Sequence, residues 1–220
     1  RLFDLDADLP MIEAHLRADP ALAARISARP GLRLPGAWSV FEAGLRALLG
    51  QQITVTAARR LGETLLDASA ITHDALPWGL NRVLPEPARI GSEALGALRM
   101  PQARRHAIGQ WIQHQASSLA IQQRGRSLQD SLQRLLDRPG IGDWSAHYIA
   151  LRGLREPDAF PASDIGLLRA MSSTDLPRID AMRLRQRAES WRPWRAYAAQ
   201  HLWASDTDFA RFNQEPTRDA

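Results

Sequence analysis

Residues 135–148 read Leu-Leu-Asp-Arg-Pro-Gly-Ile-Gly-Asp-Trp-Ser-Ala-His-Tyr, a helical pattern that breaks at Pro139-Gly140-Ile141-Gly142 and resumes at once. Two glycines in four residues permit a positive φ and let the backbone approach a ligand without an intervening Cβ. Ile141 lies between them and can anchor the turn in the core. Because the next helix starts immediately, its unpaired N–H groups and positive dipole end would point outward and form a site for one phosphate.

This hairpin has two interpretations. A phosphate site made of backbone N–H groups would hold DNA without reading its sequence. An ordinary helix-helix turn would look similar, because Pro-Gly is a common helix break.

Start signals and apolar spacing predict helices almost throughout the chain. Asp19-Pro20 places a capping residue before a proline at the first helical position, and Ser39 with Glu42 forms a capping box. The alternating Val, Ile and Thr runs typical of strands are absent. We therefore predict an all-α fold, with helices at about 20–28, 39–50, 54–68, 101–112, 127–136, 180–191 and 193–203.

The organisation of the chain follows from its breaks. Proline, glycine and charged residues cluster at 77–91 and predict a loop or a short helical insert. We expect this segment to divide one domain, residues 1–220, into helical groups of about 1–90 and 91–205. The polar stretch 207–220 is expected to be a frayed tail. The first residues form neither a signal peptide nor an initiating methionine, so we expect further chain upstream.

Composition excludes several kinds of chemistry. The chain has no cysteine, which excludes disulfides, a thiolate nucleophile and a cysteine-ligated iron–sulfur cluster. It has no lysine either, so all 28 basic residues are arginines and only the terminal amine could form a Schiff base. No segment reaches the roughly 20 apolar residues of a membrane span. The net charge of +4 mildly favours a polyanionic partner, and we expect a soluble protein.

A loop rich in glycine and proline follows the hairpin and ends in Asp164. Residues 151–164 read LRGLREPDAFPASD, and an apolar helix starts directly afterwards. The hairpin, with the small Ser145-Ala146 behind it, the loop and the aspartate resemble the signature of the helix-hairpin-helix superfamily of DNA glycosylases. The resemblance implies that Asp164 faces a nucleotide flipped out of the duplex. The alternative is a plain helix N-cap, a role that Ser163 could fill equally well.

The chemistry of base excision explains why a carboxylate is needed at this place. Breaking a glycosidic bond develops positive charge on the sugar, and a nearby carboxylate stabilises that state and can orient water. An N-alkylated purine is already cationic and departs without a strong general acid. One carboxylate, that of Asp164, would then be sufficient for catalysis.

Two departures from the wider superfamily make the chain similar to its DNA-3-methyladenine glycosylase II branch. Bifunctional members carry a lysine where this chain has Trp144, so no lyase activity is expected. The cysteines of the iron–sulfur branch are absent as well. The similarity covers about residues 1–205, with matching segments at 1–5, 41–51, 191–195 and 201–203. In that family a β-rich domain precedes this region, and we expect it to be deleted or separate here.

The resemblance also assigns residues to a base pocket and a wedge. Trp144, Tyr148 and Trp203 match residues that line the family's base pocket, and their electron-rich faces suit a cationic methylated purine. Each of the three could instead belong to the core. Ile165 replaces a tyrosine beside the catalytic aspartate of the best-known member, which makes the pocket less aromatic. Gln52 stands where that member inserts a leucine into the duplex, and a glutamine could fill the gap through hydrogen bonds.

The family hairpin can bind a monovalent cation through backbone carbonyls, which here would be those of Leu136, Arg138 and Ile141. A Na⁺ or K⁺ ion at this place would bridge to a phosphate. No other cofactor is expected.

We therefore expect a monofunctional glycosylase of base-excision repair that removes alkylated purines such as 3-methyladenine from double-stranded DNA and leaves an abasic site. It would act as a monomer in a bacterial cytoplasm, with a DNA-binding cleft between two helical groups. Two alternatives stay open, namely a glycosylase for another lesion, such as a deaminated or mismatched base, and a non-catalytic DNA-binding module.

Arginines outside these motifs also have several interpretations. They could contact DNA phosphates or form a solvated face, and residues 191–195 could instead form a packed cation–aromatic cluster. The arginines concerned are Arg99, Arg104, Arg105, Arg183, Arg185, Arg187, Arg192 and Arg195.

Overall fold

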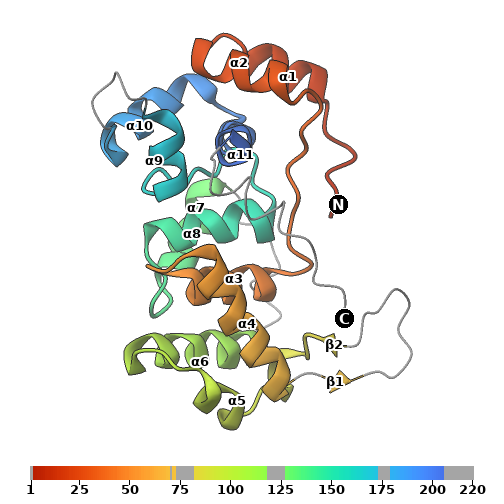
Figure 1. The fold of residues 1–220 in the computed structure, drawn as a ribbon, viewed down its shortest axis with the longest axis vertical. Coiled ribbons are helices and arrows are strands. Elements are labelled where there is room, and N and C mark those ends of the chain that lie inside the picture. Colours follow the sequence, from red (N-terminus) through yellow and green to blue (C-terminus); the bar gives the residue numbers. More distant parts are fainter. Residues whose placement is uncertain (1, 70, 73–81, 118–126, 173–178, 206–220) are drawn as a thin grey trace. The chain divides into compact units, whose positions relative to one another are not determined.

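Helices form two compact units in the computed structural model, which describes residues 2–69, 71–72, 82–117, 127–172 and 179–205 (Figure 1). The terminal unit comprises residues 1–37 and 150–220, and the central unit comprises residues 38–149. The predicted division near residue 90 is wrong, because α2 (Pro20–Ala28) packs on α11 (Arg195–Ser205) near the other end of the chain. The predicted tail at 207–220 lies outside the described residues.

The terminal unit is built around α11. Every residue of this helix from Arg195 to Ala204 is buried, and the helix packs against α2, α9 and η5. A helix buried on all sides forms the core of its unit. The other elements of the terminal unit are α1 (Leu9–Leu16), the π-helical segment η4 (Ala150–Leu154), α9 (Ile165–Met171), α10 (Ala181–Ala188) and the 3-10 turn η5 (Glu189–Trp191).

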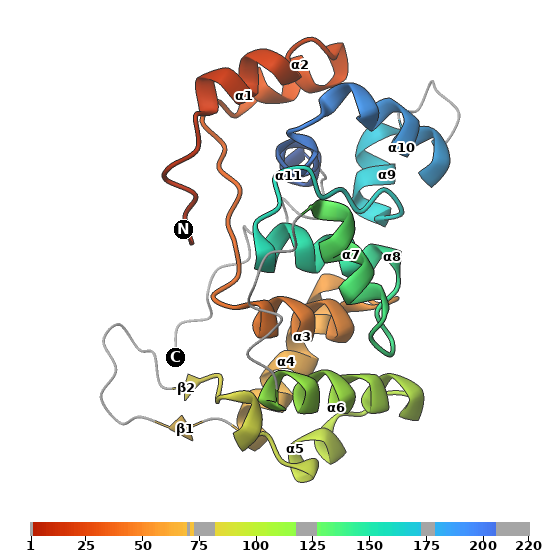
Figure 2. The same cartoon turned by 180° about the vertical axis from the view of Figure 1, so that it is seen from behind.

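The central unit is built around α3 (Val40–Gly50), with α8 on one side and α6 on the other (Figure 2). A Cβ at Gly44 would lie 2.1 Å from the indole ring of Trp111 on α6, and the Trp111 Nε1 donates to the Phe41 carbonyl at 3.1 Å. Glycine at position 44 therefore lets α6 pack directly on α3. The remaining helices of the central unit are α4 (Val55–Ser69), α5 (Ser92–Ala97), α6 (Gln102–Ser117), α7 (Leu128–Leu136) and α8 (Asp143–Ile149).

Two short strands are the only ones among the described residues, and both belong to the central unit. β1 (Ile71–Thr72) and β2 (Arg82–Val83) pair antiparallel, with Ile71 opposite Val83. The predicted loop at 77–91 is described from residue 82 onward, where β2 and the 3-10 turn η2 (Pro87–Arg89) are found. In the described part of the chain, no helix is long and apolar enough to cross a membrane. The predicted all-α architecture is confirmed.

Side-chain caps confirm four of the predicted helix starts. Each capping side chain accepts a hydrogen bond from a backbone N–H two or three residues further on, which satisfies one of the unpaired donors of the first turn. The capping residues are Asp19, Ser39, Ser127 and Asp180. Glu42 accepts from the Trp38 N–H at 2.9 Å, so the predicted capping box closes on the residue before the cap.

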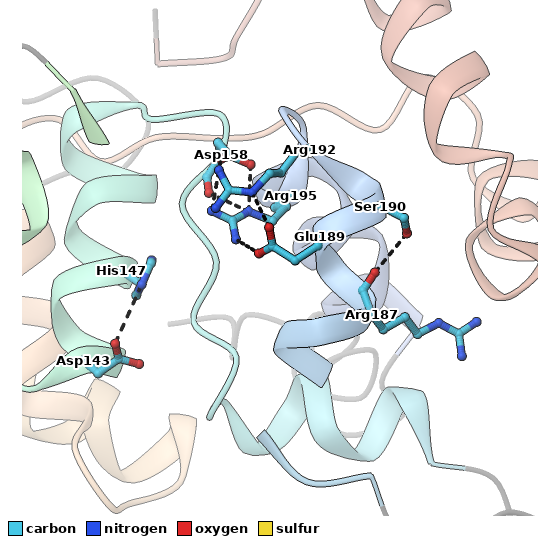
Figure 3. Close-up of polar contacts among 8 residues, drawn as sticks. All are labelled: Asp143, His147, Asp158, Arg187, Glu189, Ser190, Arg192 and Arg195. Atoms are coloured by element: carbon cyan, nitrogen blue, oxygen red, sulfur yellow. Dashed lines mark hydrogen bonds and ion pairs between the residues drawn. The ribbon is translucent and has the colours of Figure 1, made fainter. Parts of the chain in front are cut away.

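Arginine–carboxylate pairs fix the start of α11 (Figure 3). Arg195 is only 7% exposed, with its Nε 2.7 Å from Asp158 and its Nη1 3.0 Å from Glu189. Arg192 binds the same two carboxylates at 2.7 and 2.8 Å. A buried guanidinium is tolerated only when it is paired in this way. Arg192 and Arg195 are therefore both paired with carboxylates within the fold; Arg195 is buried, whereas the side chain of Arg192 is 50% exposed.

A similar pair joins α2 to α10. Arg187 binds both carboxylate oxygens of Asp19, at 2.9 and 2.7 Å, and the Trp191 Nε1 donates to the same carboxylate at 2.8 Å. Hydrogen bonds from Arg187, with a smaller contribution from Trp191, lower the pKa of Asp19 from 3.8 to about 2 despite its burial. Asp19 is therefore both a helix cap and an ion-pair partner.

We predict that Asp19→Asn lowers the free energy of unfolding at pH 7 by about 2 kcal/mol, since asparagine keeps the cap but removes the charge. The pKa of Asp19 is depressed in the folded state, so the stabilisation is full above the unfolded pKa and is lost as pH falls through about 2. Urea unfolding between pH 7 and pH 2 measures this. Asp180→Asn, at a cap that forms no ion pair with the described residues, is the matched control. A loss for Asp19→Asn that does not shrink toward pH 2 would contradict the prediction.

Candidate functional site

The hairpin between α7 and α8, Pro139–Gly142, requires glycine at position 140. Gly140 has φ 78°, and a Cβ there would lie 2.4 Å from the Cβ of Ala107 on α6. Ile141 is 6% exposed and anchors the turn in the core, as predicted. Gly142 differs, because its φ is not positive and a Cβ on it would meet no atom within 4 Å. Gly140 therefore serves the fold, while Gly142 leaves open space beside the first turn of α8.

A side chain from the end of α3 braces the hairpin. The Gln51 Nε2 donates to the Gly140 carbonyl at 2.8 Å and to the Ser145 Oγ at 3.0 Å. Ser145 is 2% exposed, so its hydroxyl depends on partners inside the protein. This role of Gln51 was not predicted from the sequence. The only sequence signal for it is a polar side chain directly after the last residue of a buried helix.

Gln52, the predicted wedge, directly follows Gln51. It is exposed and has φ 57°, a left-handed conformation that is uncommon for residues other than glycine. Such a conformation costs of the order of 1 kcal/mol and persists where the surroundings hold it. The two hydrogen bonds of Gln51 and the start of α4 flank this residue. The structure therefore places an exposed side chain on a left-handed backbone position at the turn between α3 and α4.

Trp144 and Tyr148 form a stacked pair on α8. Their positions four residues apart place both on one face of the helix, and their ring centroids are 5.3 Å apart with an interplanar angle of 19°. Both side chains are half-buried. The pair therefore presents aromatic surface within the central unit, beside the hairpin in the sequence.

The carboxylate of Asp164 is held by two N–H donors in the terminal unit. Its Oδ1 accepts from the Leu167 N–H at 3.0 Å and from the Trp203 Nε1 at 2.9 Å. Asp164 is thus the N-cap of α9, and Ser163 is exposed and does not cap the helix. The half-buried carboxylate is fixed by the buried helix α11 as well as by its own helix. The N-cap bond to the Leu167 N–H and the bond from Trp203 are both made by Oδ1.

Trp203 supports this carboxylate and carries a cation on one face. It is 8% exposed, and the guanidinium carbon of Arg152 lies 5.1 Å from its ring centroid. Arg152 also donates to the Gln200 side chain at 2.8 Å and to the Pro35 carbonyl at 2.7 Å. The structure therefore gives Trp203 a positioning role toward Asp164. Base stacking on Trp203 stays a prediction.

The predicted residues fall into two sets, one in each unit. Asp164 and Trp203 are in direct contact within the terminal unit. Ile165, the first residue of α9, belongs to the same unit and is 68% exposed. The central unit contains the hairpin, Gln52, Trp144 and Tyr148. Among the described residues, no cluster of three histidine, aspartate or glutamate side chains could hold a metal ion.

Comparisons with known proteins bear on this arrangement. The family model described as the AlkA N-terminal domain matches residues 1–39, which contain α1 and α2. A probable bifunctional transcriptional activator/DNA repair enzyme AlkA from Mycobacterium tuberculosis is 37% identical over 205 residues, which are 93% of this chain and 41% of that protein. The chain thus spans less than half the length of this relative. DNA-3-methyladenine glycosylase 2 of Escherichia coli is 32% identical over 209 residues, 94% of this chain and 70% of that protein.

A solved structure shows the same fold. The 3-methyladenine DNA-glycosylase from Archaeoglobus fulgidus superposes with a TM-score of 0.77 over 95% of this chain and 72% of that chain. Its sequence identity is 21%, so the likeness concerns the fold alone. The predicted helix-hairpin-helix glycosylase fold is confirmed.

We predict that alanine changes stability by very different amounts at the two hairpin glycines. Gly140→Ala should destabilise the protein by about 2–4 kcal/mol, because it combines a left-handed φ with a contact too short for two carbon atoms. Gly142→Ala should change stability by less than about 0.5 kcal/mol, because its Cβ meets open space. Thermal unfolding of both variants measures the difference. Equal destabilisation at the two positions would show that the hairpin geometry is wrong.

Proposed function

The chain belongs to the DNA-3-methyladenine glycosylase II family, and we propose that it is a monofunctional DNA glycosylase that hydrolyses the bond between deoxyribose and an alkylated purine, leaving an abasic site. The observation that carries this proposal is the carboxylate of Asp164. Two N–H donors, from Leu167 and Trp203, hold one of its oxygens at 3.0 and 2.9 Å. A carboxylate fixed in this way can act on the sugar without first having to be ordered.

The role of Asp164 is electrostatic. As the glycosidic bond lengthens, positive charge develops on the sugar, and a preorganised carboxylate stabilises that charge at no reorganisation cost. Asp164 would also orient the water that attacks the sugar carbon. Trp203 positions Asp164 in this scheme, since its indole N–H donates to the Asp164 carboxylate, and it stays a candidate for stacking on the base.

The substrate class follows from the leaving group. An N-alkylated purine such as 3-methyladenine already carries positive charge and leaves without a strong acid, so one carboxylate is sufficient. Electron-rich rings attract such a cation more than a neutral base. The half-buried stacked rings of Trp144 and Tyr148 are the candidates for this contact, and the contact of Arg152 with Trp203 is an example of the same attraction within the chain.

Duplex DNA is the proposed partner. The hairpin Pro139-Gly140-Ile141-Gly142 would bind one phosphate through the N–H groups of the first turn of α8, with the open space at Gly142 allowing close approach. Gln52 would fill the gap left by the extruded nucleotide. Extrusion costs a few kcal/mol and less at a weakened pair, which favours damaged sites before the pocket contributes.

A monovalent cation at the hairpin is part of the proposal. The carbonyls of Leu136, Arg138 and Ile141 would hold a Na⁺ or K⁺ ion. The Arg138 carbonyl accepts the Ile141 N–H at 3.1 Å, and a carbonyl oxygen has a second lone pair available for such a ligand. The ion would add positive charge where a phosphate binds.

We predict that Asp164→Asn slows base release by a factor of about 100–1000, because it removes the charge that stabilises the sugar cation. Asparagine keeps the cap and can still accept from Trp203, so binding to duplex DNA should stay within a few-fold of the wild type. Single-turnover release of 3-methyladenine from methylated duplex DNA, with binding measured in parallel, checks both. Ser163→Ala, an exposed neighbour that does not cap α9, is the control.

The outcomes of this experiment distinguish the catalytic role of Asp164, a non-catalytic DNA-binding module and a glycosylase for another lesion. Release by Asp164→Asn at the wild-type rate would remove Asp164 from the mechanism. A wild type that binds duplex DNA and releases no base would leave only a non-catalytic DNA-binding module. Faster release of a deaminated or mismatched base than of 3-methyladenine would assign the chain to another lesion.

The absence of lysine predicts that the product strand stays intact. Lyase cleavage proceeds through a Schiff base to an amine, and this chain offers only its terminal amine. Gel electrophoresis of the end-labelled strand should show full-length DNA after base release and cleavage only after alkali. Cleavage before alkali treatment would contradict a hydrolytic mechanism.

A further inference from the structure

The central unit contains a groove, and one residue of its lining, Ile53, directly follows the predicted wedge Gln52 in the sequence. Its volume is about 340 Å³, and it lies between α4 and the residues that join α5 to α6. Apolar side chains of Ile53, Ala57 and Leu61 contribute to its lining. Three arginines complete the main part of the lining, namely Arg60, Arg99 and Arg104.

These three arginines keep their charge unneutralised. Among the described residues, none of their side chains makes a hydrogen bond or an ion pair, and no carboxylate lines the groove. Arg60 and Arg99 are exposed and Arg104 is half-buried. A guanidinium is always charged and binds phosphate well. Three unpaired guanidinium groups on one small groove therefore select an anionic ligand.

Three other arginines of the chain differ from those of the groove, because each of them forms an ion pair with a carboxylate. Arg59, one residue from Arg60 on the same helix, pairs with Glu63 at 3.2 Å. Arg46 of α3 pairs with Glu42 at 2.7 Å. In the terminal unit, Arg187 is bound by Asp19. Carboxylates neutralise these arginines, while the described lining of the groove contains no carboxylate.

The position of the groove specifies which anion it would bind. Gln52 is exposed at the turn that leads into α4, and Ile53 of the groove comes next. DNA carries a phosphate for every ~3.4 Å of axis on each strand, so a duplex entered by Gln52 would bring several phosphates past α4. The apolar lining suits the deoxyribose between those phosphates.

We propose that this groove, through Arg60, Arg99 and Arg104, binds the phosphate backbone of duplex DNA next to the point at which Gln52 enters. The inference rests on the proposed function in taking duplex DNA as the partner. The groove would be a second site that contacts the DNA phosphate backbone, and it would bind phosphate by a different interaction from that of the hairpin. The hairpin offers backbone N–H groups to a phosphate, whereas the groove offers three cations, whose binding releases counterions and depends on salt.

The test is the salt dependence of DNA affinity for Arg60→Gln/Arg99→Gln/Arg104→Gln. The probe is a duplex with a tetrahydrofuran abasic analogue, and fluorescence anisotropy measures its association constant at several NaCl concentrations. The slope of log K against log salt should become less steep by ~2.7, at ~0.9 for each phosphate that the variant no longer neutralises, which corresponds to ~100-fold weaker binding near 0.15 M salt.

Two further variants make the result specific. Arg59→Gln removes the same charge from the same helix at a position already paired with Glu63, and its slope should equal that of the wild type. The triple lysine variant, with Arg60→Lys, Arg99→Lys and Arg104→Lys, keeps the charges and should retain the wild-type slope, since lysine binds phosphate as a point charge. Thermal unfolding should differ little among all of them, because Arg59, Arg60 and Arg99 are exposed and the half-buried Arg104 makes no side-chain hydrogen bond or ion pair with the described residues.

Base release by the wild type separates the two proposals. If the wild type releases base and the triple glutamine variant keeps the wild-type slope, the groove does not bind DNA and the proposed function stands. If the wild type neither binds duplex DNA nor releases base, the proposed function fails and the inference about the groove fails with it. A reduced slope for the glutamine variant, with the wild-type slope for Arg59→Gln and for the lysine variant, supports the groove.

Discussion

The hydrogen bond from the Trp203 indole to the Asp164 carboxylate is the contact on which the proposed chemistry of this protein depends. It joins the first turn of α9 to α11, the helix that is buried along almost its whole length. A carboxylate on an exposed loop would sample many positions, and ordering it would cost free energy during the reaction. Here the core of the terminal unit provides that order, so packing around α11 and chemistry at Asp164 are parts of one arrangement.

Arginine performs two separate tasks in a chain that has no lysine. In the terminal unit Arg187, Arg192 and Arg195 are bound by carboxylates, and this pairing allows Arg195 to be buried. In the groove of the central unit, arginines face no carboxylate among the residues that the structure describes. Net charge does not distinguish the two cases, because a paired guanidinium contributes little field beyond its partner. The positive charge available to an anionic partner therefore depends on which arginines lack carboxylates, and this is visible only in the fold.

Local signals predicted much of the structure from the sequence. Helix caps and the Pro139–Gly142 hairpin involve residues within a few positions of one another, and they were found correctly. The division into units was missed, because it depends on packing between α2 and α11, far apart in the chain. Gln51 was missed for the same reason. Arg99 and Arg104 were named as candidate phosphate contacts, but their grouping with Arg60 of α4 depends on distant segments and was not predicted. The catalytic role of Asp164 was inferred from a resemblance, and the structure adds the hydrogen bonds that hold it.

Stabilisation of positive charge on the sugar by Asp164 is tested most directly by the affinity of the protein for a charged mimic of that sugar. Duplexes that differ only in a cationic pyrrolidine or a neutral tetrahydrofuran at the abasic position isolate the charge. We expect the wild type to bind the cationic duplex at least ~100-fold more tightly, as a transition-state mimic would be bound, and Asp164→Asn to lose most of this preference. An equal preference in the wild type and in Asp164→Asn would contradict the claim.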